Sequence, residues 1–243
     1  MSEDNDRENC ENIMDFVPAP SCSEDKFYED EIFDPGYKLT VRCDELIRDV
    51  RPFILTCIIN NLDMTDDRLR RFINLQSKLH QRDCKDRKLA SIATHDLEKL
   101  TLPVRYEARP AKKTMMRVLG EVKDVNIHRL LNVEDPLEKK RRAVDRYRHH
   151  LVGCDMVPVL IDNTNTVISL HPVTNCEKTR VTTTTTSLLV EVTSTVSIDI
   201  CQRIMDSLIE LTVPLCPELK VQQMRIINFE GDTMNEFMLE STN

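Results

Sequence analysis

Apolar runs separated by turn residues predict three strands in the second half of the chain. Residues 158–161 and 166–170 are short, mostly apolar runs on either side of the turn sequence Asp162-Asn163-Thr164-Asn165, so they predict a hairpin. A third strand is expected at residues 188–193. The segment between them, 171–187, is polar and contains no glycine. Because connections inside compact domains usually span about 4–6 residues, a connection of this length indicates a functional or disordered loop.

A helix with clear start signals is predicted after residue 64. Thr65 can cap it, and the two aspartates that follow suit the positive end of its dipole. Its predicted apolar face consists of Leu69, Phe72, Ile73 and Leu79. Gln76 falls on the same stripe, so a polar side chain is expected to point toward the interior or a cleft.

The remaining pattern alternates short strands with amphipathic helices. Strands are predicted at 37–41, 53–59, 89–96 and within 221–231, a helical turn at 44–50, and helices at 126–132, 136–151 and 198–211. The order of these elements predicts an α+β domain in which helices pack on a mixed sheet. It occupies residues 35–243, and a family resemblance given below implies a variable linker at about 111–135.

The charge is distributed unevenly. The net charge is −8, yet residues 1–34 carry twelve acidic residues against Arg7 and Lys26, which leaves the remainder close to neutral. A segment this charged buries too little apolar surface to fold, so a disordered acidic tail is predicted. It acts either as a solubilising arm or, through Phe27, Tyr28 and Phe33, as a binding motif for a protein partner in translation.

Composition excludes several kinds of chemistry. The sequence has four glycines and no glycine-rich phosphate loop, so nucleoside triphosphate chemistry is not expected. No cofactor is expected, the nine cysteines include no CxxC pair, and no metal site is predicted. No apolar run is long enough to cross a membrane and the N-terminus has no signal-peptide pattern, which favours a soluble, cytoplasmic protein with reduced core thiols.

Two long strings of residues resemble a known family. LQSKLHQRDCKDRKLASIATHDL and SLHPVTNCEKTRVTTTTTSLLVEVTST, together with VRPFILTCII, YEARP and VQQMRIINFEG, resemble the B3/B4 domain of the phenylalanyl-tRNA synthetase β-subunit family of eukaryotes and archaea. The second string is closer still to the C-terminal B3/B4 domain of leucine-rich repeat-containing protein forty-seven. The resemblance extends over nearly the whole chain from residue 37.

The resemblance implies both a function and a site. In the synthetases this domain is the editing domain, which hydrolyses tyrosine wrongly attached to the tRNA. Glu191 would accept the tyrosyl hydroxyl, Arg87 and Arg180 would hold phosphates of the acceptor end, and His95 beside Asp96 would supply an oriented imidazole. Alternatively, Asp96 simply caps the segment that follows the strand. The implied pocket residues are Gln76, Arg87, His95, Thr179, Glu191 and Thr193.

Four positions depart from the family pattern. Ala93 and Cys176 stand where the synthetase subunit has glycine, His171 replaces the second proline of a Pro-Pro pair, and Val196 ends a motif differently. These departures call hydrolysis into question. No Ser-His or Cys-His pair has family support as a nucleophile and base, so no catalytic residue is assigned.

A basic helix face is the densest candidate for phosphate contact. Such a face is usually only solvated, but as a functional surface it suits RNA phosphates. The residues concerned are Lys139, Lys140, Arg141, Arg142, Arg146 and Arg148, with Lys178 and Arg180 in the polar loop.

Three functions therefore remain open. The first is a free-standing domain that binds RNA, tRNA above all, and does not aminoacylate by itself. The second is an esterase that edits mischarged tyrosyl-tRNA of the phenylalanine type. The third is a protein-interaction module that has lost RNA binding.

Overall fold

The described residues form two stacked β-sheets with helices on the outside, which confirms the predicted α+β class. The structure is a computed structural model and describes residues 39–132 and 142–236. The predicted acidic tail and the first turns of the helix expected from residue 136 lie outside these ranges. No helix of the described ranges combines the length and apolar character needed to cross a membrane.

The larger sheet is mixed. Within the described residues its seven strands run in the order β13-β12-β1-β4-β7-β8-β9. Strand β1 is parallel to β12 and to β4, and the other neighbours are antiparallel. The bounds are β1 Thr40–Cys43, β4 Val104–Pro110, β7 Met156–Ile161, β8 Val167–Leu170, β9 Thr174–Asn175, β12 Arg225–Ile227 and β13 Thr233–Glu236.

The smaller sheet is antiparallel, with the order β11-β2-β10-β3 among the described strands. Its strands are β2 Phe53–Asn60, β3 Ala90–Asp96, β10 Leu188–Ser194 and β11 Lys220–Gln223. All seven residues of β10 and all seven of β3 are buried. Because successive side chains of a strand point to opposite faces, this pattern means that both faces of the small sheet are covered.

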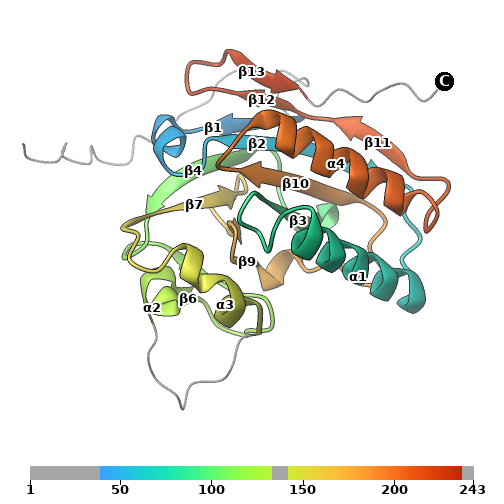
Figure 1. The fold of residues 1–243 in the computed structure, drawn as a ribbon, viewed down its shortest axis with the longest axis horizontal. Helices are drawn as coiled ribbons and strands as arrows, with labels where there is room; N and C mark the ends of the chain where they lie inside the picture. Colours follow the sequence, from blue (N-terminus) through green and yellow to red (C-terminus); the bar gives the residue numbers. More distant parts are fainter. Residues whose placement is uncertain (1–38, 133–141, 237–243) are drawn as a thin grey trace, which may run out of the picture. The chain divides into compact units, whose positions relative to one another are not determined.

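Two long helices cover one face of the small sheet (Figure 1). They are α1, Asp66–Arg82, and α4, Ile198–Thr212. Phe72 of α1 and Met205 of α4 join Val190 and Val192 of β10 in one apolar cluster. Ser197 caps α4 by accepting a hydrogen bond from the backbone N–H of Ile200.

The other face of the small sheet packs against the large sheet. Leu189 of β10 and Ile58 of β2 lie in a cluster with Tyr106 of β4 and Leu160 of β7. The polar residues at alternate positions of β10, Glu191 and Thr193, point into this same layer because they share the parity of Leu189. The strand therefore directs its polar side chains into the protein rather than toward water.

A third layer covers the far side of the large sheet. Here Val159 of β7 packs with Ile127, Leu131 and Val144. The layer contains the two-stranded ribbon of β5 (Met115–Met116) and β6 (Val125–Asn126), together with α2 (Ile127–Leu131) and α3 (Arg142–Tyr147). Short 3₁₀ turns lie at Glu45–Asp49, Leu97–Lys99, Arg148–His150 and Glu177–Thr179.

Several sequence predictions need correction at this level. The α-helical part of the segment expected at 136–151 ends at Tyr147 and continues as a 3₁₀ turn, and Val144, Tyr147 and Leu151 are buried. Ile73, predicted to lie on the apolar face of its helix, is 51% exposed. The 171–187 loop contains β9 and a 3₁₀ turn, and the strand that follows it pairs in the second sheet.

Candidate functional site

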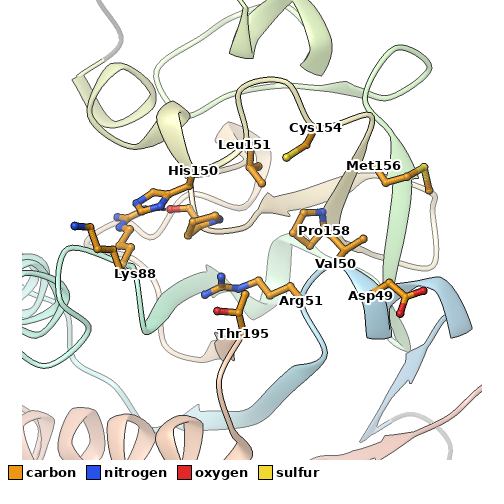
Figure 2. A pocket seen from close by; sticks show the side chains of 12 residues that line it. Asp49, Val50, Arg51, Lys88, His150, Leu151, Cys154, Met156, Pro158 and Thr195 are labelled. Atoms are coloured by element: carbon orange, nitrogen blue, oxygen red, sulfur yellow. Dashed lines mark hydrogen bonds between the residues drawn. The ribbon is translucent and has the colours of Figure 1, made fainter. Parts of the chain in front are cut away.

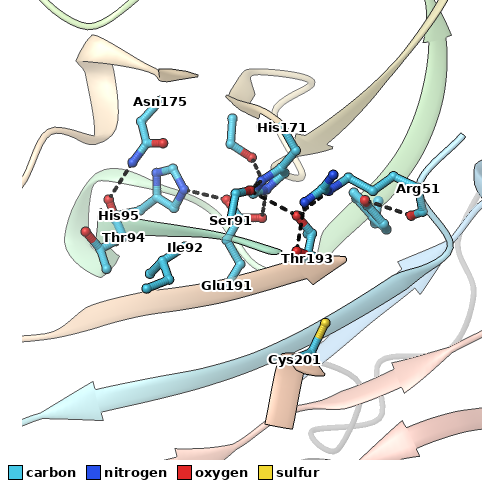
Figure 3. A network of polar contacts seen from close by, with 12 residues as sticks. Arg51, Ser91, Ile92, Thr94, His95, His171, Asn175, Glu191, Thr193 and Cys201 are labelled. Carbon is cyan, nitrogen blue, oxygen red and sulfur yellow. Dashed lines mark hydrogen bonds and ion pairs between the residues drawn. The ribbon is translucent and has the colours of Figure 1, made fainter. Parts of the chain in front are cut away.

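Glu191 lies at the centre of a buried polar network between the two sheets (Figure 3). It is the middle residue of β10 and has Thr56 of β2 and Ala93 of β3 as its cross-strand neighbours. Its side chain is 0% exposed. Burying an ionised carboxylate costs several kcal/mol unless nearby donors satisfy it.

His95 supplies the first donor from within the same sheet. Its Nε2 lies 2.8 Å from Glu191 Oε1 and its Nδ1 lies 2.8 Å from Thr179 Oγ1. Thr179 closes the 3₁₀ turn that follows β9, and its side chain is buried. The imidazole is thus held at both nitrogens by two residues that are distant in sequence.

His171 supplies the second contact from the opposite sheet. It follows β8 directly, and its Nε2 lies 2.8 Å from Glu191 Oε2. Its Nδ1 lies 2.8 Å from Ser91 Oγ, and the edge of the Tyr106 ring packs against it. Both carboxylate oxygens of Glu191 therefore face histidine nitrogens.

The charge of this cluster follows from its geometry. Burial by itself raises the pKa of Glu191, but the contacts with His171 and His95 outweigh burial and hold the pKa well below its usual value of 4.5. Burial lowers the pKa of His171 and outweighs the attraction of Glu191. Glu191 is accordingly ionised at neutral pH and His171 is neutral; Oε1 contacts His95, whereas Oε2 lies 2.8 Å from His171 Nε2 but has no hydrogen-bond partner among the described residues.

A chain of hydroxyls extends the network to a buried guanidinium. Arg51 is 4% exposed and donates from Nε to Thr193 Oγ1 (2.7 Å) and from Nη2 to the Thr193 carbonyl (2.9 Å). Thr193 Oγ1 lies 3.2 Å from Ser91 Oγ, which contacts His171. Arg51 and Glu191 are therefore linked through Thr193, Ser91 and His171 without touching each other.

Gln76 makes its polar contact on the helix-covered face of the small sheet, apart from the Glu191 network. Gln76 Nε2 donates to Thr94 Oγ1 at 3.0 Å, and Asn175 Nδ2 donates to the Thr94 carbonyl at 3.2 Å. The predicted inward orientation of Gln76 is confirmed by this contact. Asp96 caps the next turn by accepting from the Glu98 backbone N–H, while His95 points into the network. Of the two alternatives considered for the His95-Asp96 pair, capping describes Asp96, and a held imidazole describes His95.

Arg87 lies outside this network. Its Nη1 donates to the backbone carbonyls of Pro172 (2.8 Å) and Val173 (3.2 Å), and its guanidinium stacks over the Tyr147 ring at 4.1 Å. Its Nε is buried without a hydrogen-bond partner. Burial lowers the pKa of Arg87 to about 10, so it remains charged at neutral pH. Contact with phosphate at this residue stays a prediction.

The predicted phosphate-binding residues are scattered. Lys139, Lys140 and Arg141 lie outside the described residues, and so does the side chain of Arg142. Arg146 forms an ion pair with Asp86 at 2.6 Å, and Arg180 forms one with Glu177 at 2.8 Å. Lys178 is exposed beside Thr179.

The departures from the family pattern differ in their consequences. His171 contacts Glu191 directly, and Ala93 is its buried cross-strand neighbour. Cys176 is buried and caps the 3₁₀ turn through Sγ, which accepts from the Lys178 N–H. Val196 is 53% exposed. Of the four, His171 is the residue that occupies the space beside the carboxylate.

Sequence reasoning missed Arg51 and Ser91 as members of the network. The Arg51-Pro52 pair served only to mark the start of a strand, and nothing local shows that its guanidinium meets Thr193, 142 positions later. In residues 39–132 and 142–236, no group of three or more His, Cys, Asp or Glu side chains is arranged to hold a metal ion.

Comparison with known proteins connects this fold to one group. No protein-family model matches the chain. It is 32% identical over 146 residues to the human phenylalanine–tRNA ligase beta subunit, a match covering 60% of this chain and 24% of that protein. The yeast (Saccharomyces cerevisiae) subunit is 30% identical over 66% of the chain and 28% of the relative, and the Archaeoglobus fulgidus subunit is 34% identical over 65% and 27%.

A solved structure shares the fold. The N-terminal fragment of the phenylalanyl-tRNA synthetase beta subunit from Pyrococcus horikoshii superposes with a TM-score of 0.72 at 24% identity, covering 82% of this chain and 54% of the fragment. Together these matches confirm the relationship to the phenylalanine–tRNA ligase beta subunit predicted from the sequence motifs. The chain spans about a quarter of the length of those curated relatives.

Proposed function

We propose that this chain binds tRNA through its β-subunit-like domain and does not hydrolyse the aminoacyl ester. The observation that carries the second half of the proposal is the burial of Glu191, whose two oxygens face His95 and His171 and whose side chain is 0% exposed. A pocket that recognises a substrate hydroxyl must offer its polar group to the ligand. In this protein the side chains of His95 and His171 already contact that polar group, the Glu191 carboxylate.

RNA binding is supported by the relatives and by charge. The matching proteins are named as subunits of a tRNA ligase. Around Thr179 the exposed cations Lys178 and Arg180 flank the turn, and Lys99 donates to the Arg180 carbonyl. Lys178 is the best candidate for phosphate contact, because Arg180 already pairs with Glu177.

Counterion release gives a direct test. Binding of unacylated tRNA is measured by fluorescence anisotropy between about 50 and 200 mM salt for wild type and for Lys178→Glu. If Lys178 contacts a phosphate, the affinity falls and the slope of log K against log salt decreases by about 0.7–0.9. Lys220→Glu, on the edge strand β11, makes the same charge change at another exposed site and should have little effect.

The predicted basic helix face is tested in the same assay. The triple variant Arg141→Glu, Arg142→Glu, Arg146→Glu reverses three charges at once, and a decrease in the salt slope by about two or more would place that face on RNA. Wild-type protein that does not bind tRNA at the lowest salt would overturn the proposal and leave the protein-interaction function as its replacement.

The esterase remains the alternative that one observation favours. His95, Thr179, Glu191 and Thr193 lie together in the layer between the sheets, which supports a pocket there, whereas Gln76 contacts Thr94 on the face that α1 covers. Hydrolysis would require His171 to move away from Glu191 so that a substrate could reach the carboxylate. We further propose a cytoplasmic location, in line with a plant relative named as the cytoplasmic subunit, and binding of a translation protein by the acidic tail.

A further inference from the structure

A second site opens at the Arg51 end of the buried network. It is a cavity of about 340 Å³ between the start of β7, the loop before β2 and the segment after α3 (Figure 2). This volume lies at the lower end of the range for small-molecule pockets, about 300–1,000 Å³, and exceeds what a bare oxyanion needs. The cavity does not include Glu191 or His95.

The cavity contains a buried guanidinium with unused donor capacity. Arg51 directs Nε and Nη2 to Thr193, whereas Nη1 has no acceptor and no carboxylate lies within ion-pair distance of it in the part of the chain that the structure describes. Figure 2 shows its side chain extending into the cavity below His150 and Leu151. A buried guanidinium without a counter-anion is costly, and an oxyanion that accepts from Nη1 offsets that cost.

The other lining residues strengthen the positive charge. Arg87, with its orphaned Nε, and the exposed Lys88 also line the cavity, and neither forms an ion pair within the described residues. Asp49 is the one carboxylate among the lining residues, and in Figure 2 it lies on the opposite side of the cavity from Lys88. Three cationic side chains against one carboxylate suit a group that carries two negative charges.

The remaining wall is apolar. Leu151, Met156 and Pro158 line the cavity beside the cations. A phosphate offers three oxygens, which matches three separate cations better than the two oxygens of a carboxylate do. The apolar wall and the spare volume suit a flat organic group attached to that phosphate.

We propose that this cavity binds a small phosphate monoester, with the phosphate among Arg51, Arg87 and Lys88 and its organic group against the Leu151 and Pro158 wall. The proposal is independent of tRNA binding through Lys178, because the lining residues do not include Lys178. The phosphate is held by side chains, which agrees with the absence of a glycine-rich loop from the sequence.

Calorimetric titration with phenyl phosphate tests the proposal. We expect saturable binding that is at least about tenfold tighter than that of inorganic phosphate or phenol, because each of these lacks half of the ligand. Lys88→Glu should weaken it about tenfold or more. Lys85→Glu, a charge reversal three residues away that does not line the cavity, should leave it unchanged.

A chemical footprint provides a second readout. Cys154 lines the cavity and is exposed, so bound phenyl phosphate should slow its alkylation by iodoacetamide, as followed by mass spectrometry of the Cys154 peptide. Arg51→Lys should abolish both binding and protection. If that variant does not fold, Lys88→Glu against Lys85→Glu decides the matter.

Competition binding distinguishes two natural sources of the phosphate group. Adenosine 5′-monophosphate represents a free phosphate monoester, and a 5′-phosphorylated single-stranded RNA represents a terminal phosphate. Displacement of phenyl phosphate by either supports the site and identifies its source. The absence of phenyl phosphate binding, equal binding by the two lysine variants, or unprotected Cys154 would overturn the proposal.

Discussion

His171 and Glu191 meet across the interface between the two sheets. His171 Nε2, at the end of β8, lies 2.8 Å from Glu191 Oε2 in the middle of β10. The large sheet thereby places an imidazole against a carboxylate of the small sheet, and His95 contacts the other oxygen from the small sheet itself. The contact joins the two sheets and leaves Glu191 fully buried.

Removing the carboxylate should destabilise the fold strongly. Glu191→Ala leaves His95 Nε2 buried without an acceptor and leaves His171 Nε2 with Ser169 Oγ alone, and breaking a buried polar pair from one side costs about 3–5 kcal/mol. Urea unfolding measures the loss. Glu210→Ala, an exposed glutamate of α4, is the matched control and should stay within about 0.5 kcal/mol of wild type. Similar values for the two variants would show that the network carries little stability.

The hydroxyl of Thr193 should contribute to stability independently of Glu191. Thr193→Val retains the shape of the side chain but removes the acceptor for Arg51 Nε and the link to Ser91. Leaving the guanidinium short of one acceptor should cost about 1–3 kcal/mol in urea unfolding. Thr183→Val, on the exposed loop before β10, makes the same chemical change in solvent. A loss at Thr193 no larger than that at Thr183 would contradict the chain of contacts.

Acid should destabilise the protein from about pH 6.5 downward. Burial lowers the pKa values of His80 and His171, so below their usual value of 6.5 the unfolded state binds protons that the folded state does not. Stability is therefore full above pH 6.5 and falls as pH decreases. Glu191, whose folded pKa lies below 4.5, adds a further loss below about pH 4.5.

His80 provides the most direct test of the predicted loss of stability in acid. Its Nε2 accepts a hydrogen bond from the Ile92 backbone N–H at 2.9 Å, a contact that a protonated ring cannot make. His80→Gln retains an acceptor but cannot titrate. Between pH 6.5 and 5 the slope of unfolding free energy against pH should decrease by up to about 1.4 kcal/mol per pH unit. An unchanged slope would assign the acid sensitivity to other groups.

Local sequence patterns predicted the strands and helices more accurately than they predicted the arrangement of the site residues. The runs at β2 and β10 were found because alternation and flanking turn residues are local signals. Ile73 was misassigned because the buried stripe of α1 passes through Phe72 and Leu79, with Leu75 partly buried, and Ile73 lies at the edge of that stripe. Counting the apolar positions of one helix does not show which of those positions a neighbouring element covers.

The site depends on contacts that no local signal records. Motif resemblance indicated Gln76, Glu191 and Thr193; the last two point into the layer between the sheets, whereas Gln76 contacts Thr94 on the face that α1 covers. That His171 would fill the space beside Glu191 depends on how β8 stacks over β10, which is a long-range property. The same holds for Arg51, because its partner lies on a strand 142 residues away.

Binding of tRNA without hydrolysis of the ester is tested most directly by measuring both on one sample of mischarged tRNA. Tyrosyl-tRNA of the phenylalanine type is titrated with the purified chain, and release of tyrosine is followed at saturating protein against buffer alone. We predict saturable, salt-sensitive binding with release no faster than in buffer, because His95 and His171 occupy both oxygens of Glu191. Release that is accelerated by the wild-type chain and loses its preference for the tyrosyl over the phenylalanyl ester in Glu191→Ala would contradict it.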